Sequence, residues 1–108
     1  MASSVIKNDI GITTPLNVTG NSFSFNIPSS PHYFGIISLV TYGSGTNLES
    51  ILIPFRGSAT SIGVGTPTGV GNNLDSLISS VTVNSGVVAV SLSRNVSLMG
   101  GVTAYATV

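Results

Sequence analysis

Residues 33–56 read YFGIISLVTYGSGTNLESILIPFR and contain two apolar segments joined by a polar loop. The first segment, YFGIISLVTY, and the second, SILIPFR, have the lengths of β-strands, and GSGTNLE lies between them. Residues 36–40 are apolar apart from Ser38, which is typical of a strand in the centre of a sheet. Because both segments are so apolar, we expect both faces of this strand pair to be covered.

In the second segment, successive side chains alternate between two faces of the expected strand. Ile51, Ile53 and Phe55 share one face of the expected strand, and residues 52, 54 and 56 share the other. Pro54 has no N–H to donate, so the strand is expected to be an edge or to carry a bulge there. We expect the Ile51 face in the core, with Leu52 and Arg56 near a contact between subunits.

Alternation with a period of two also marks the flanking sequence. Residues 22–27, SFSFNI, predict a half-buried strand, and the polar residues 17–21 before them predict a turn. In the last third, a hairpin turn is expected at residues 84–86, NSG, and a break at residues 97–101. Residues 102–108 alternate again, so that Tyr105 points away from the small side chains, toward a second sheet or a partner subunit.

Between these regions the signals are weaker. The glycine-rich residues 63–71 predict an exposed loop, and residues 72–77 offer a helical turn that Asn73 or Asp75 could cap. The chain of 108 residues has room for one domain. Seven or eight strands with this spacing predict an all-β fold, an antiparallel sandwich or barrel, and we expect a single antiparallel β-sandwich. Residues 1–21 could add an N-terminal strand or arm.

Charge is sparse. Only 6% of the residues are charged and the formal net charge is zero, compared with roughly 25% charged residues in an ordinary domain. Three scattered cations cannot form the basic stripe that nucleic-acid binding needs. A surface this neutral tends to associate, so we expect a homo-oligomer. The longest near-apolar run is half of the roughly 20 residues of a membrane helix, and the N-terminus lacks the apolar segment of a signal peptide, which predicts synthesis in the cytoplasm without membrane insertion.

No motif for catalysis is recognisable. The glycine-rich stretch lacks the Gly-Lys-Ser/Thr of a phosphate loop, His32 is the single histidine, and there is no cysteine. The three acids fall in or beside predicted turns, where carboxylates usually serve local hydrogen bonding. The sequence therefore predicts neither an enzyme nor a metal or cofactor site. Recognition by loops remains, and the residues expected to carry it are His32, Tyr33, Tyr42, Asn47, Glu49, Asn72, Asn73 and Asp75.

The segments YFGIISLVTYG, ILIPFRG, SVTVNSGVVAVSLSRNVSL and GGVTAYATV together resemble the small C-terminal head domains of bacteriophage tail-fibre and spike proteins. Many of those heads are β-sandwiches akin to the jelly rolls of the C1q and tumour-necrosis-factor families. The resemblance implies a homotrimer in the virion that binds a glycan or protein of the host surface. Two alternatives stay open: a capsid decoration or jelly-roll coat protein that binds the capsid shell, and a cellular lectin or adhesin domain.

Overall fold

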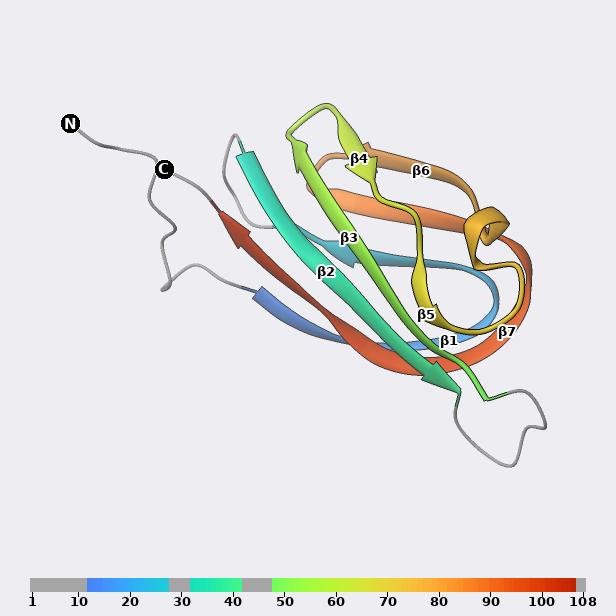
Figure 1. Ribbon diagram of the computed structural model, residues 1–108. Coiled ribbons are helices and arrows are strands. Elements are labelled where there is room, and N and C mark those ends of the chain that lie inside the picture. The colour runs from blue at the N-terminus through green and yellow to red at the C-terminus, as the bar shows by residue number, and fades with distance from the viewer. Residues whose placement is uncertain (1–11, 28–31, 42–47, 107–108) are drawn as a thin grey trace.

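The computed structural model describes residues 12–27, 32–41 and 48–106, which form one antiparallel sheet of seven strands and a 3₁₀ turn (Figure 1). The elements are β1 (Ile12–Asn26), β2 (His32–Thr41), β3 (Ser50–Ser58), β4 (Ile62–Val64), β5 (Thr68–Val70), η2 (Leu74–Ser76), β6 (Ile78–Asn84) and β7 (Val87–Ala106). The predicted all-β, antiparallel architecture is confirmed.

The sheet runs in the order β1-β7-β2-β3-β4, with β5 paired to β3 and β6 paired to β7. The strands β1 and β7 are long and bend together. Residues 12–20 of β1 pair with residues 96–104 of β7, whereas residues 22–26 pair with residues 87–91. The register shifts between these two parts, so the sheet folds over on itself there. One layer contains β2, β3 and the C-terminal part of β7, and the other contains β6 and the N-terminal part of β7.

The core lies between the two layers. In β3, Ile51, Ile53 and Phe55 are at most 5% exposed, which confirms the inner face predicted from their alternation. From the opposite layer, Phe25 brings its ring to 5.5 Å from that of Phe55. Fully burying one such side chain contributes about 1.5–3 kcal/mol. The other buried apolar residues are Leu16, Val18, Tyr33, Ile37, Leu39, Leu77, Val88, Val90, Leu92, Val96, Leu98, Val102, Ala104 and Ala106.

Two predicted interruptions are wrong. The turn expected at residues 17–21 and the break expected at residues 97–101 both lie inside continuous strands, β1 and β7. These two segments pair with each other, so that Thr19 lies opposite Ser97. Gly20, with φ of 119°, accommodates the bend where two strands change direction. Long-range pairing has therefore overridden local turn signals.

The predicted hairpin between β6 and β7 is confirmed. Ser85 and Gly86 have φ values of 50° and 80°, and two successive positive values are typical of the two-residue turns that suit the twist of a hairpin. The predicted helical turn is also present as η2, and Asn73 precedes it. The Asn73 side chain forms no capping hydrogen bond, so its predicted role as a cap is wrong.

The glycine-rich residues 63–71 are not simply a loop. They contribute to β4 and β5, which pair side by side with different parts of β3. Pro54 lies in the gap between β4 and β5, where neither strand pairs with β3. On this side its carbonyl oxygen accepts a 2.7 Å hydrogen bond from the N–H of Gly65. The strand β3 is thus a local edge at Pro54, as its missing N–H predicted.

Candidate functional site

The layer built from β1, β7, β2 and β3 has a second face, which points away from the core. Residues directly opposite each other in an antiparallel pair project on the same side, so the register defines this face. Phe34 lies opposite both Arg56 and Tyr105, and Ser38 lies opposite both Leu52 and Gly101. We call this surface the outer face; its residues are Pro15, Asn17, Phe34, Ile36, Ser38, Val40, Ser50, Leu52, Pro54, Arg56, Thr68, Val70, Met99, Gly101, Thr103 and Tyr105.

The outer face collects exposed apolar side chains. Seven large apolar residues are exposed in the part of the chain that the structure describes, and five of them lie on this face. They are Ile36 (37% exposed), Val40 (45%), Leu52 (44%), Val70 (65%) and Met99 (47%). Within the single chain only the inner face of the β2–β3 pair is covered, so the expected cover of the second face stays a prediction. An apolar patch of this kind on a folded domain commonly marks a site of interaction.

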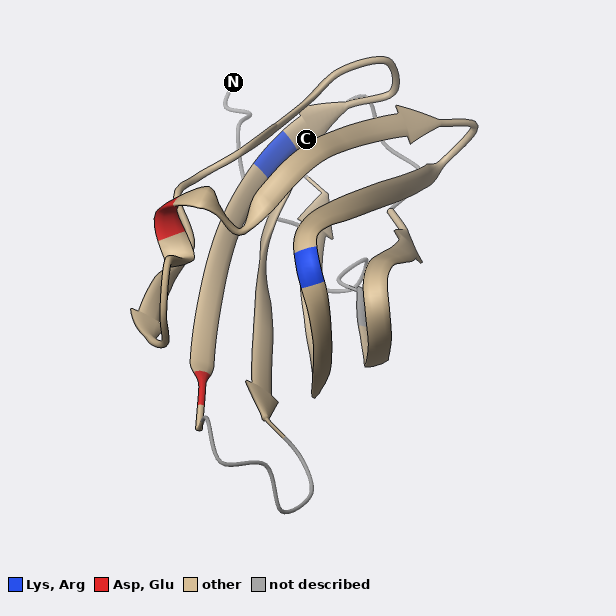
Figure 2. Cartoon of the chain, turned by 90° about the vertical axis from the view of Figure 1, so that its right-hand side faces the viewer, with Lys and Arg blue, Asp and Glu red and all other residues tan. Residues whose placement is uncertain are grey.

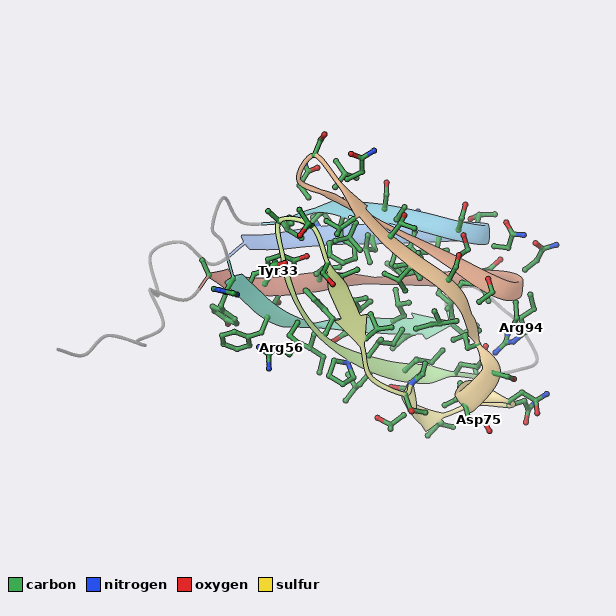
Figure 3. All side chains as sticks on the ribbon, turned by 90° about the horizontal axis from the view of Figure 1, so that it is seen from above. Tyr33, Arg56, Asp75 and Arg94 are labelled. Carbon is green, nitrogen blue, oxygen red and sulfur yellow. The ribbon has the colours of Figure 1, made fainter. Side chains whose placement is uncertain are left out.

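One end of the outer face carries aromatic side chains and a cation. The rings of Phe34 and Tyr105 are half-buried and lie 5.7 Å apart, and Arg56 lies beside Phe34 on the neighbouring strand. In Figure 3 the Arg56 side chain extends from the edge of the ribbon, whereas Tyr33 lies between the layers. The structure thus brings Leu52 and Arg56 of β3 and Tyr105 of β7, predicted as subunit contacts, to one surface.

At the opposite end of β3, an ion pair joins three distant segments. Arg94 in the bend of β7 donates from Nη2 to Oε2 of Glu49 at 2.6 Å and from Nη1 to Oε1 at 3.2 Å. The Nη2 atom also donates to the carbonyl oxygen of Asn72 at 3.4 Å. The Glu49 N–H donates to Oγ1 of Thr41 at 2.8 Å. These bonds fix the start of β3, the turn after β5 and the bend of β7 relative to one another.

The residues predicted to recognise a ligand lie in different environments in the structure. The prediction that Tyr33 is a loop residue is wrong, because it lies within β2 and is only 2% exposed, with its ring tilted against that of Phe55 at a centroid distance of 6.3 Å. Burial raises the pKa of its hydroxyl, which has no hydrogen-bond partner among the described residues. Glu49 is turned inward to Arg94, its side chain 8% exposed. Tyr42 and Asn47 lie outside the described residues.

The remaining candidates stay at the surface. His32 is exposed at the first position of β2. Asn72, Asn73 and Asp75 are exposed and follow one another around η2. They lie beside the Glu49–Arg94 pair, so the structure does bring three of the predicted residues into one polar turn. The sequence reasoning missed Arg94, which lies in a polar stretch of β7 with no motif around it.

Charged groups are few. Figure 2 shows the two arginines and two acids of the described ranges at separate places on the ribbon, and among them the side chains of Arg94 and Glu49 form an ion pair. Within those ranges, no group of three or more His, Cys, Asp or Glu side chains could hold a metal ion. The same ranges contain no helix with the length and apolar character required to span a bilayer.

Comparisons of the chain with models of known protein families, with curated proteins and with solved structures find no match. The two surfaces, the outer face and the polar turn of residues 72–75, are therefore interpreted from their own chemistry.

Proposed function

We propose that this chain is a non-enzymatic structural and attachment protein of a phage or virus particle, of the type that forms the head of a tail fibre or spike, and that it works as a homo-oligomer, with a trimer favoured. The observation that carries the proposal is the exposed apolar outer face on a chain with only 6% charged residues. Such a surface is typical of a protein that assembles with other copies or partners rather than one that stays monomeric. The resemblance of the strand segments to phage head domains supports the virion setting.

The polar turn after β5 is the surface that would meet the host. Asn73 and Asp75 are exposed there, and amide and carboxylate groups exchange hydrogen bonds with sugar hydroxyls or with polar protein surfaces. The Glu49–Arg94 pair holds the backbone of the turn through the carbonyl of Asn72. A turn fixed on a β-scaffold in this way presents its side chains with little conformational freedom to lose on binding.

Binding to bacterial cells tests the proposal. Fluorescently labelled protein is incubated with a panel of strains and with their purified surface polysaccharides, and bound protein is measured. We expect saturable binding to some strains, and the variant N73A/D75A should lose most of it. The matched control is Thr82→Ala, an exposed residue on β6 away from the turn. Equal binding by N73A/D75A and wild type would contradict the assignment of the turn.

Other outcomes identify the alternatives. A capsid decoration or coat protein would label capsids evenly in electron micrographs and would not adsorb to cells. A cellular lectin or adhesin domain would retain a sugar on a glycan array without association with virions. Either result replaces the attachment proposal. A monomeric mass by light scattering at micromolar concentration would contradict the homo-oligomer.

A further inference from the structure

We infer that the outer face is the surface on which copies of this chain pack against one another, its occupant being the outer face of a second copy. The inference rests on the homo-oligomer of the proposed function and assigns its contact surface. Because the same face meets itself, the contact is two-fold and pairs two copies, in contrast to the trimer that the resemblance favours. The five exposed apolar residues of this face come from β2, β3, β5 and β7, so the surface exists only once the sheet has formed.

Charge favours a second copy over an unrelated partner. Arg56 is the one charged residue on the outer face among the residues whose side chains are described, and it lies in the end row with Phe34 and Tyr105. A partner with ordinary charge density would lose the hydration of its own charges against Ile36 and Leu52 without gaining counter-ions. A copy of the same face brings no charge to the centre, since its single arginine also lies at the edge.

The large and small side chains of the outer face are placed so that two copies of it can fit together. Ser38 and Gly101 lie opposite each other at its centre and are the two smallest residues there. Around them, on the same and adjacent strands, stand the exposed side chains of Ile36, Val40, Leu52 and Met99. A large side chain of one copy can therefore lie over the small centre of the other, which is how packed interfaces reach the density of a protein interior.

The size of the face also suits a contact between copies. From Ser50 to Arg56 the face is about 20 Å long, and its four main strands make it roughly 15–20 Å wide, given the usual rise and spacing of strands. The plane thus covers about 300–400 Å², within the range of the largest, often functional patches on monomers. A stable interface buries about 800 Å² per partner, so the outer face would supply the apolar centre of such a contact, and the rest of the buried area would have to come from the residues around it.

A pair of matched aspartate variants tests the inference. Leu52→Asp places a charge on the outer face, whereas Val87→Asp places one at an exposed apolar position (38% exposed) on the other layer. By sedimentation velocity and light scattering, we expect Leu52→Asp to weaken assembly by at least about 30-fold, as loss of a central contact does. Val87→Asp should keep the wild-type mass. Retention of the oligomer by Leu52→Asp, or its loss in Val87→Asp, would overturn the assignment.

A second measurement covers the case in which Leu52→Asp fails to fold. The chain has no cysteine, so a single introduced thiol reports contacts between copies without competition. Under mild oxidation, Ser38→Cys should form disulfide-linked dimers through the centre of the face, and Thr82→Cys on β6 should not. The opposite pattern would exclude the outer face as the contact. If the wild-type protein assembled but did not bind to cells, that result would contradict the attachment proposal, and the inference about the contact surface would still stand.

Discussion

Arg94 and Glu49 lie 45 residues apart in sequence, yet the guanidinium of one donates two hydrogen bonds to the carboxylate of the other. Arginine and carboxylate match in a bidentate arrangement of this kind, which gives direction as well as energy. The pair is also asymmetric in burial: the Arg94 side chain is 35% exposed and that of Glu49 only 8%. Most of the free-energy cost of losing the pair therefore comes from leaving the buried carboxylate of Glu49 without a partner.

Arg94→Ala should lower the free energy of unfolding by about 1.5–3 kcal/mol, the range for a hydrogen bond to a charged group. The reason is that the carboxylate of Glu49 stays largely out of water with no counter-ion. Urea unfolding followed by circular dichroism measures the change. Asp75→Ala is the control, because Asp75 is exposed and makes no ion pair within the described ranges; its change should stay within about 0.5 kcal/mol.

A double variant separates the two parts of this cost. R94M/E49Q removes both charges while keeping side chains of similar length, so no unpaired carboxylate remains. It should recover part of the stability lost in Arg94→Ala, because loss of one partner of a buried pair costs more than loss of both. A double variant less stable than Arg94→Ala would mean that the pair itself, rather than the stranded carboxylate, carries the energy.

The buried hydroxyl of Tyr33 predicts how stability depends on pH. Burial raises its pKa in the folded protein above the ordinary value of 10.0. The unfolded chain then releases this proton at lower pH than the folded chain, so the contribution to stability is complete below about pH 10 and declines as the pH rises toward the folded pKa. Unfolding midpoints in urea between pH 9 and 11.5 should fall for the wild type.

Tyr33→Phe is the matched variant for that titration. It should flatten the alkaline part of the profile that Tyr33 causes. At pH 7 it should be neutral or stabilising, because the hydroxyl has no hydrogen-bond partner among the described residues and its burial is uncompensated. A loss of more than about 1 kcal/mol at pH 7 would show that the hydroxyl is bonded in solution, for example by an ordered water.

Local patterns in the sequence predicted what depends on neighbouring residues. The inner face of β3 followed from the alternation of residues 51–55, and the β6–β7 hairpin followed from residues 84–86, whose preference for positive φ is intrinsic. The gap at Pro54 followed from the missing N–H. In each case a few adjacent residues contain the physical cause.

Features that depend on distant pairing could not be predicted in the same way. Residues 17–21 carry turn-forming residues, but opposite residues 96–99 of β7 they become strand. The apolar run at residues 33–42 has no alternation, so it gave no indication that Tyr33 and Ile37 face the core while Phe34 and Ile36 face outward. The outer face became visible only with the register of β2 against its two neighbours.

The two sides of β3 offer a direct contrast in stability. Ile53 is fully buried, and Ile53→Ala should cost about 2–5 kcal/mol because it leaves a cavity between the layers. Leu52→Ala removes a side chain that is 44% exposed in the isolated chain, so its effect on the unfolding of the monomer should be below about 1 kcal/mol. Urea unfolding at concentrations low enough for the monomer to dominate compares the two variants. Equal losses would mean that Leu52 is packed within its own chain.

The substitution Gly35→Ala tests how closely β2 approaches its neighbouring strands. A Cβ atom built on Gly35 would collide with the backbone carbonyl oxygen of Thr103, and it would lie 2.8 Å from Cζ of Phe55 and 2.9 Å from Cα of Ala104. Two of these three atoms belong to the backbone of β7, so the collision cannot be relieved by a side-chain rotation. Gly35→Ala should therefore cost more than the roughly 1–3 kcal/mol of ordinary overpacking.

Gly63→Ala is the control for that substitution. Gly63 lies in β4, and the nearest heavy atom to an added Cβ is the carbonyl oxygen of Arg56 at 4.0 Å, an ordinary contact. Its substitution should change the free energy of unfolding by no more than about 0.5 kcal/mol, as at other open surface positions. Thermal unfolding by calorimetry measures both variants. A stable Gly35→Ala protein would mean that β2 and β7 lie farther apart than the register of Gly35 opposite Ala104 requires.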